Sequence, residues 1–265
     1  MAVDMTSMTS TESSAAAEPG CLRVLTLNIQ VGMQTAHYGH YVTGAWRHML
    51  PSGRVRANLD RIAELASQFD LVALQEADAG SLRTAQLNQV EYLARRAGLS
   101  HWQIAVNRNL GPFAQHCLGV LSRYPLLDPE HHELPGRVRG RGALAATLEL
   151  PGHEALRVVV THLALSRASR RHQFDYLARL LPARSELLML GDLNCEAEEL
   201  LQNRPLRAIG LKPVAGAATF PSWRPQRRLD HILVTGGLQI TSTHVVAMPL
   251  SDHLAVAADI RLRPA

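Results

Sequence analysis

The pattern of apolar and polar positions divides the chain into short apolar runs and segments with helical spacing. Short apolar runs bounded by Gly, Pro or polar residues are typical of β-strands. They predict strands at Leu22–Asn28, Leu71–Gln75, His101–Val106, Cys117–Ser122, Ala143–Leu150, Leu156–Leu163, Glu186–Leu190, Leu229–Val234, His244–Ala247 and Leu254–Leu262. Helical spacing predicts helices at Arg56–Phe69, Thr84–Ala97 and Arg167–Leu181. Many strands with few helices favour one α/β or α+β domain, in which two sheets pack together with the helices outside.

Two segments stand apart from this pattern. The first 20 residues are rich in Ser, Thr and Ala and lack the basic and apolar regions of a secretory signal. We expect them to form a disordered tail, which leaves residues 21–265 as a single domain. The loop Gln30–Val55 is unusually long and contains His37, Tyr38, His40, Tyr41, Trp46 and His48. Such loops are usually functional or disordered, and the aromatic content fits either an ordered cover or a substrate-recognition role.

Composition limits the class of protein without naming its function. Of the 265 residues, 46% are apolar and 19% are charged, which excludes a disordered chain and a disulfide scaffold. The formal net charge of +4 permits an anionic substrate but does not require nucleic acid. Cys21, Cys117 and Cys195 form no CxxC pair, and no apolar run reaches the roughly 18 residues that cross a bilayer. We therefore expect reduced thiols, a cytoplasmic location and no transmembrane segment.

Polar side chains recur at the ends of the apolar strands. The set comprises Asn28, Gln75, Glu76, His162, Asp192, Asn194, Asp230, His231, Asp252 and His253. One polar strand end is often only a turn residue. A carboxylate at the mouth of a buried strand is costly, however, unless it is paired or bound to a metal ion. Six such ends, with four carboxylates and three histidines, indicate that the strands converge on one charged site.

These residue types suit the hydrolysis of a phosphoester. The carboxylates of Glu76, Asp192 and Asp252 are hard oxygen donors, which favour Mg²⁺ or Mn²⁺. Such an ion would neutralise a phosphate oxygen and stabilise the leaving oxyanion. A neighbouring carboxylate, Asp230 or Asp252, would fix the tautomer of His253 and raise its basicity for the deprotonation of water. Asn194 would orient the nucleophile or donate to a phosphoryl oxygen.

The same segments resemble a known family. LTLNIQ, LVALQEAD, LSRYPL, VVVTHL, LGDLNCE, RLDHILV and SDHLAV, in this order, resemble the endonuclease/exonuclease/phosphatase superfamily of deoxyribonuclease I-like hydrolases. The resemblance extends from the first strand to the last. It implies an α/β fold, a four-layer α/β/β/α sandwich of two packed mixed β-sheets flanked by helices, as the catalytic domain over residues 21–265. It also implies a phosphoric ester hydrolase that depends on Mg²⁺ or Mn²⁺.

The resemblance further implies where a metal ion would bind. Asn28 and Glu76 would lie at the ion, with Glu76 as the principal ligand and Asp252 assisting. His231 stands where many members carry Tyr, so it would be structural.

The catalytic roles implied by the resemblance fall on five residues. Asp192 would position or activate the water, and Asn194 would hold the nucleophile or the phosphate. His253 would be the general base or bind the phosphate directly, with Asp230 buttressing it. His162 would be a general acid or a phosphate ligand, as in the sphingomyelinase-like and deoxyribonuclease I-like branches.

The substrate class stays open at this stage. Basic residues gather at Ser166–His172, at Arg224–Arg228 after Trp223, and at Arg137–Arg141. We predict that Arg170 and Arg171 contact phosphate and that Trp223 stacks on a base, although a solvated helix face or charged loop would have the same composition. Many members of the family carry Gly-Asn before the LSR segment, where this chain has Cys117 and Leu118, so one substrate contact is absent or replaced.

Three functions fit these observations. The first is a phosphodiesterase that acts on DNA or RNA, which we narrowly favour. The second is a lipid-headgroup or small-molecule phosphodiesterase or phosphatase, with the 30–55 loop as the selector. The third is a binding module without catalysis, but such a module would have lost Glu76 or His253, and this chain retains both.

Overall fold

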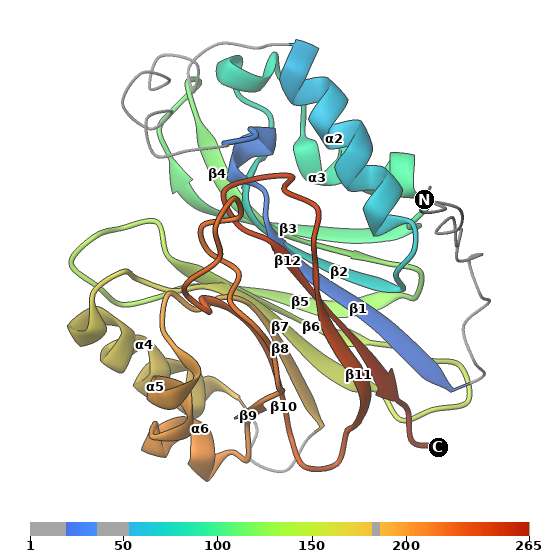
Figure 1. Cartoon of the computed structure of the whole chain (residues 1–265), viewed down its shortest axis with the longest axis vertical. Coiled ribbons are helices and arrows are strands. Elements are labelled where there is room, and N and C mark those ends of the chain that lie inside the picture. Colours follow the sequence, from blue (N-terminus) through green and yellow to red (C-terminus); the bar gives the residue numbers. More distant parts are fainter. Residues whose placement is uncertain (1–19, 36–52, 182–185, 265) are drawn as a thin grey trace, which may run out of the picture.

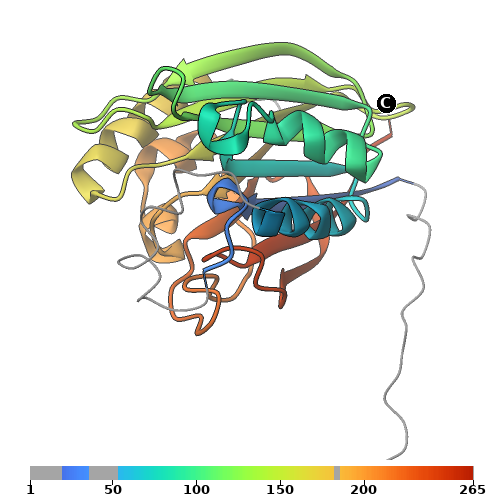
Figure 2. The ribbon, with the colours of Figure 1, turned by 90° about the horizontal axis from the view of Figure 1, so that it is seen from above.

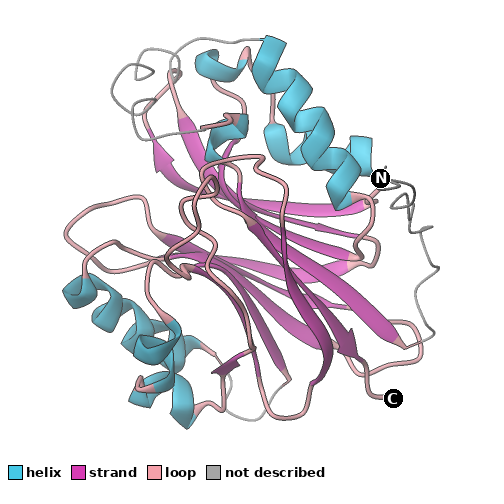
Figure 3. Cartoon of the chain, viewed as in Figure 1, coloured by secondary structure: helices cyan, strands magenta, loops and turns pink. Residues whose placement is uncertain are grey.

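Two packed β-sheets form the centre of the molecule, and helices cover their outer faces. The computed structural model describes residues 20–35, 53–181 and 186–264. Nearly all of the predicted tail and the aromatic and histidine residues of the 30–55 loop therefore lie outside the described residues. Figure 3 shows the sheets lying between two groups of helices. This arrangement confirms the predicted α/β/β/α sandwich.

The first sheet contains six strands. They are β1 (Cys21–Asn28), β2 (Leu71–Asp78), β3 (His101–Asn109), β4 (Gln115–Ser122), β11 (Gln239–Val246) and β12 (Ala255–Arg261). Their order is β11-β12-β1-β2-β4-β3. β1 is parallel to β2 and antiparallel to β12. The C-terminal ends of β1 and β2 therefore meet the start of β12 at one end of the sheet.

The second sheet also contains six strands. They are β5 (Leu126–Glu133), β6 (Gly142–Leu148), β7 (Leu156–His162), β8 (Leu187–Asp192), β9 (Lys212–Pro213) and β10 (Asp230–Val234). Their order is β5-β6-β7-β8-β10-β9. β7 and β8 are parallel, and β10 is antiparallel to β8. The C-terminal ends of β7 and β8 therefore meet the start of β10.

The helices divide between the two outer faces. The α-helices are α2 (Gly53–Ala66), α3 (Gln89–Ala97), α4 (Arg167–Leu180), α5 (Ala197–Leu201) and α6 (Arg204–Ala208), and the 3-10 helices are η1 (Gln30–Gly32) and η3 (Leu82–Thr84). α2 and α3 pack on the first sheet, whereas α4 to α6 pack on the second, as Figures 1 and 2 show. None of the helices in the described part of the chain is long and apolar enough to cross a membrane.

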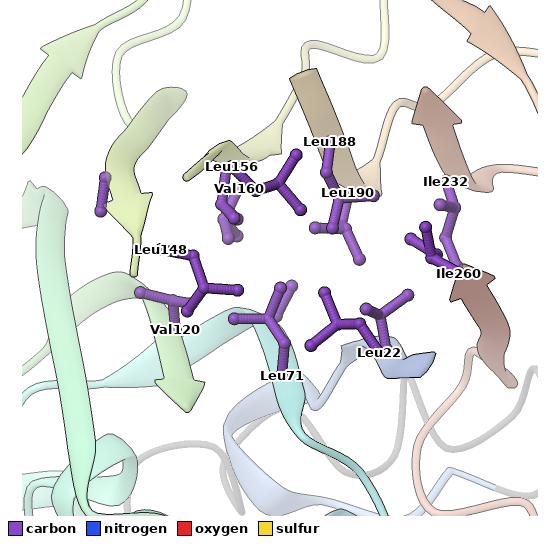
Figure 4. Close-up of a cluster of buried hydrophobic side chains, with 14 of the residues drawn as sticks. Leu22, Leu71, Val120, Leu148, Leu156, Val160, Leu188, Leu190, Ile232 and Ile260 are labelled. Carbon is purple, nitrogen blue, oxygen red and sulfur yellow. The ribbon is translucent and has the colours of Figure 1, made fainter. Parts of the chain in front are cut away.

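The core between the sheets follows from the two-residue period of a strand, which turns alternate side chains to opposite faces. In β1, Leu22 and Val24 face the other sheet, whereas Leu25 and Leu27 pack under the helices. Other strands alternate in the same way. Figure 4 shows the residues between the sheets, among them Leu71, Leu156, Val160, Leu188, Leu190 and Ile232. The two sheets therefore share a dry apolar interface.

The structure corrects part of the predicted secondary structure. The single helix predicted over Thr84–Ala97 is wrong, because η3 ends at Thr84 and α3 begins only at Gln89. The side chain of Asn88 accepts hydrogen bonds from the backbone of Val90 and Glu91, which caps α3 and fixes its start. β5 was not predicted because its sequence, LLDPEHHE, is polar and largely exposed. α5 and α6 are too short to show a helical period.

We expect Gly191→Ala to destabilise the protein by at least ~2 kcal/mol. A Cβ at Gly191 would lie 1.9 Å from the carbonyl oxygen of Thr161 in the neighbouring strand, and the φ of Gly191 is 154°. Urea unfolding measures the change. The matched control is Gly236→Ala, because a Cβ there meets no atom within 4 Å. Equal stability of the two variants would contradict a close approach of β7 and β8 at this point.

Candidate active site

The polar residues predicted at strand ends lie on the same face of their strands as the apolar side chains that pack between the sheets. In β7, Val158 and Val160 face the other sheet, and His162 is the next residue in that alternation. Leu188 and Leu190 lead to Asp192 in β8 in the same way. The strand register places His162 beside Asp192, and Asp192 beside Asp230. The alternation that builds the apolar core thus delivers these side chains to one end of it.

Glu76 reaches the same place through an irregularity in β2. The pairing of β2 with β4 shifts between Leu74 and Ala77, and Glu76 has a φ of 54°. This left-handed conformation is uncommon outside glycine and costs free energy. It directs the half-buried carboxylate across to the second sheet, where Oε1 lies 3.8 Å from Nε2 of His162.

A buried network fixes the chain just beyond Glu76. The carboxylate of Asp78 accepts hydrogen bonds from Nε of Arg83 at 2.6 Å, from the backbone and hydroxyl of Ser81, and from the hydroxyl of Thr84. Burial opposes ionisation, but Arg83 and the hydrogen bonds hold the pKa of Asp78 below its usual range. Sequence reasoning missed this anchor, because Asp78 resembles an ordinary turn residue.

Asp192 is the hub of the cluster. Its Oδ2 accepts a hydrogen bond from Nδ2 of Asn28 at 3.2 Å, and it lies 3.3 Å from Nε2 of His162 and 3.9 Å from Nε2 of His253. Its Oδ1 accepts from the backbone of Asn194 at 3.0 Å. Burial alone would raise the pKa of Asp192, but the positive charge of His253 and the hydrogen bonds from His162 and Asn28 lower it below the usual range. Asp192 is therefore ionised inside the protein.

His253 lies between two buried aspartates. Its Nδ1 donates to Oδ2 of Asp230 at 2.8 Å, and the same oxygen accepts from the hydroxyl of Thr219 at 2.6 Å. The ring of Phe220 packs on the imidazole with the centroids 4.9 Å apart. Burial would lower the pKa of His253, but the charges of Asp230, Asp192 and Asp252 raise it to about 10. Without a bound ion, His253 is therefore an imidazolium at neutral pH.

His162 has a partner that the sequence analysis did not assign. Nη1 of Arg141 lies 2.7 Å from Nδ1 of His162 and also contacts Nε2. A guanidinium only donates, so a neutral His162 accepts from Arg141 through one ring nitrogen and carries its proton on the other. Burial lowers the pKa of Arg141, while Glu76 and Asp192 act in the opposite direction. Only the ambiguous basic cluster at Arg137–Arg141 signalled this residue in the sequence.

The remaining predicted residues lie around this centre. Asn194 has a φ of 53° and donates from Nδ2 to the carbonyl oxygen of Leu163 at 3.0 Å. Asp252 is buried, adjoins His253, and accepts at its carbonyl oxygen from the backbone of Ser222. His231 is buried, and its Nε2 contacts the carbonyl oxygens of Cys195 and Arg228. These contacts fit the structural role expected for His231.

The donor set suits a hard divalent cation. Four carboxylates, from Glu76, Asp192, Asp230 and Asp252, surround two histidines and Arg141. Such an accumulation of buried negative charge is costly unless cations compensate it. The ligand atoms of Asp192, Asp230 and His253 lie within 4.8 Å of one another, a group that includes neither Glu76 nor Asp252. Because Asp230 and His253 already hydrogen bond to each other, the edge between Glu76 and Asp192 is the better place for an ion.

Asn28 orients Asp192. Its Oδ1 accepts from the backbone of Gln30 at 3.1 Å, and its Nδ2 donates to Asp192. An amide oxygen has a second lone pair, so these hydrogen bonds are compatible with the predicted role of Asn28 at a metal ion.

The structure does not support a substrate contact by Arg170. Its side chain is 7% exposed, and all three guanidinium nitrogens donate within the protein, to Glu199 and to the carbonyl oxygens of Ala164 and Leu165. Arg170 therefore joins α4 to α5, which corrects the prediction. Arg171, next to it, is exposed, and Trp223 is half-buried in the segment before β10.

Comparisons with known proteins identify relatives of this chain. The sequence model described as Endonuclease/Exonuclease/phosphatase family matches residues 25–253. No curated protein sequence gives a match. The fold is similar to that of an endonuclease/exonuclease/phosphatase from Beutenbergia cavernae, with 23% identity, a TM-score of 0.73, and 92% of this chain and 72% of that chain covered.

Two further solved structures share the fold. The human nocturnin catalytic domain with bound sulfate anion is 20% identical, with a TM-score of 0.67 and coverage of 92% of this chain and 94% of that chain. A humanised TDP2 from D. rerio is 17% identical, with a TM-score of 0.66 and coverage of 91% and 99%.

We expect Asp230→Asn to lower the pKa of His253 by about 1–3 units, because the substitution removes the closest negative charge and leaves a neutral partner. The imidazolium would then lose its proton at a lower pH than in the unsubstituted protein. NMR titration of the imidazole in the presence of a chelator measures the change. The control is Asp128→Asn, an exposed aspartate with a φ of 46°, which asparagine tolerates. An unchanged titration of His253 in Asp230→Asn would contradict the charge pairing.

Proposed function

We propose, from the premise that this chain belongs to the endonuclease/exonuclease/phosphatase family, that it is a Mg²⁺- or Mn²⁺-dependent hydrolase of phosphodiester bonds. The observation that carries the proposal is the convergence on Asp192. Asn28, His162 and His253 all contact this buried carboxylate, and Glu76 lies near the same ring nitrogen of His162 as Asp192 does. Buried titratable groups that are held together by specific charge partners are typical of active sites.

Glu76 and Asp192 would hold the ion, with Asp252 adding negative charge nearby and Asn28 orienting Asp192. When bound, a divalent cation would neutralise a phosphoryl oxygen and stabilise the leaving oxyanion. Asp192 would accept a hydrogen bond from the attacking water and orient it toward phosphorus. The amide of Asn194, held by the carbonyl oxygen of Leu163, would sit beside that water.

The two histidines would take different roles. His253, protonated between Asp230 and Asp192, would donate from Nε2 to a phosphoryl oxygen, which favours phosphate binding over the general-base alternative. His162 would donate its Nε2 proton to the leaving oxygen as the bond from phosphorus to that oxygen breaks. Arg141, which contacts both ring nitrogens of His162, would orient the ring.

For the substrate, we narrowly favour nucleic acid. The support is general: arginines lie beside the site, and the description of the family names endonucleases and exonucleases. A lipid-headgroup or small-molecule phosphodiesterase or phosphatase is the second candidate. The bound sulfate in the nocturnin structure fits recognition of phosphate in either case. We also propose a cytoplasmic location, since the buried Cys117 and Cys195 are free thiols.

We expect Glu76→Gln and His253→Ala each to lower kcat/KM for bis-p-nitrophenyl phosphate at least ~100-fold in the presence of Mg²⁺ or Mn²⁺, because each removes a charge at the reacting phosphate. Release of p-nitrophenol measures the loss, and circular dichroism checks the fold. Glu64→Gln, an exposed glutamate in α2, is the control and should keep full activity. Wild-type turnover by either active-site variant would refute the assigned roles.

Salt dependence separates the two substrate classes. If the substrate is nucleic acid, the logarithm of kcat/KM on plasmid or single-stranded DNA should fall with the logarithm of salt concentration by about 0.7–0.9 for each phosphate contacted. Hydrolysis of bis-p-nitrophenyl phosphate, which has one phosphate, provides the internal control. Equal slopes for the polymer and the small diester would count against nucleic acid as the substrate.

A further inference from the structure

A basic recess adjoins the catalytic cluster on the side of Glu76 and His162. Its volume is about 150 Å³, and it is lined by Glu76, Asn107, Arg108, His116, Cys117, Val138, Arg139, Gly140, Arg141 and His162. Pockets that enclose a whole small ligand usually measure about 300–1,000 Å³. The recess is therefore the size of a chemical group rather than of a complete substrate.

The three guanidinium groups of the recess, from Arg108, Arg139 and Arg141, differ from other arginines of this protein. Arg83, Arg123 and Arg170 pair with Asp78, Asp70 and Glu199. Within residues 20–35, 53–181 and 186–264, no carboxylate forms an ion pair with the three recess arginines. Glu76 is the carboxylate among the lining residues, so three positive charges in the recess face one negative charge. Such an excess of like charge is unfavourable and is relieved by an anion.

The fold builds this recess from both sheets. Arg108 lies near the end of β3 in the first sheet, whereas Arg139 and Arg141 lie in the segment between β5 and β6 of the second sheet. Gly140, with a φ of 99°, lets the two segments approach, because a Cβ there would lie 3.0 Å from the side chain of Arg108. At Gly142, a Cβ would lie 2.8 Å from Oδ1 of Asn107. These close approaches bring β3 and the segment before β6 together, which places the three arginines around one recess.

The recess is continuous with the reaction site. Arg141 contacts His162, and Glu76 and His162 line both the recess and the catalytic cluster. His116 adds a polar side chain, and burial together with the charge of Arg83 lowers its pKa to about 4, so it is neutral. The positive charge in the recess therefore comes from arginine, whose planar group binds phosphate in a bidentate manner.

We propose that this recess binds a second phosphate of the substrate, next to the phosphate that is hydrolysed. The proposal rests on the proposed function and extends it: the substrate carries at least two phosphates close together. Arg108 and Arg139 select the substrate and take no part in bond cleavage. The second phosphate is either a diester in a polynucleotide backbone or a terminal monoester on a small molecule, and both present the same anionic oxygens to the arginines.

Short oligothymidylates test the proposal. The substrates are dTpdT, which has one phosphate, and three molecules that add a second: pdTpdT and dTpdTp with a terminal monoester, and dTpdTpdT with a further diester. The chain variants are Arg108→Ala, Arg139→Ala and their combination, with Arg137→Ala as the control, since Arg137 is exposed in the same segment and does not line the recess. Chromatography of the products gives kcat/KM for each combination of protein variant and substrate.

The wild-type protein should prefer at least one two-phosphate substrate over dTpdT by about tenfold, the effect of one charge-assisted contact. The double variant should lose that preference and hydrolyse dTpdT as before, and Arg137→Ala should keep it. A gain with dTpdTpdT alone identifies a backbone diester, whereas a gain with pdTpdT or dTpdTp alone identifies a terminal monoester. Equal kcat/KM for all four substrates, or a preference that survives in the double variant, overturns the proposal.

A binding measurement tests the recess independently of hydrolysis, so a failure of the proposed function can be told apart from a failure of the second-phosphate site. If the wild-type protein hydrolyses neither dTpdT nor bis-p-nitrophenyl phosphate, the proposed function fails, and calorimetry then decides on the recess. Thymidine 3′,5′-bisphosphate should bind about tenfold more tightly than thymidine 5′-monophosphate in the presence of a chelator, and the double variant should bind both equally. Equal affinities in the wild-type protein overturn the second-phosphate site.

Discussion

The structure depends on one feature: the apolar interface between the two sheets is followed, at one end, by a cluster of charged side chains. The side chains between the sheets are mostly aliphatic, and they give way at one end to the polar side chains of Asn28, His162, Asp192 and Asp230. A buried carboxylate at such a position is tolerated only when neighbours compensate it. Asp192 meets this condition through two histidines and an amide. The pairing that keeps these groups buried also brings the catalytic residues together.

Two of the candidate site residues hold unusual backbone conformations. Glu76 and Asn194 have φ values of 54° and 53°, and each precedes or follows residues locked by hydrogen bonds. Conformations of this kind persist only where the surroundings impose them. For Glu76 the surroundings are the buried hydrogen bonds of Asp78, and for Asn194 they are Asp192 and Leu163. The strain at Glu76 is thus supported by contacts outside the predicted catalytic set.

The sequence was sufficient to predict the layers and the residues at the strand ends, because both follow from local periodicity and from short motifs. It was not sufficient for Arg141, whose importance arises only when the segment before β6 meets His162. It also misplaced Arg170, because a basic helix face looks the same in sequence whether its arginine faces solvent or Glu199. The start of α3 was missed because Asn88, the cap, lies inside an apparently continuous helical pattern.

Charge is distributed unevenly across the site. One region is suited to a cation, and the other is suited to an anion. Around Asp192 and Asp230 the negative charges outnumber the positive ones, which favours a cation and a water molecule. Beyond His162 the balance reverses, since three arginines face Glu76 alone. A substrate with a single phosphate needs only the first region, whereas the second gains free energy only from a further anion. Binding in the recess can therefore change which phosphoester is chosen while the residues around the reacting phosphorus stay the same.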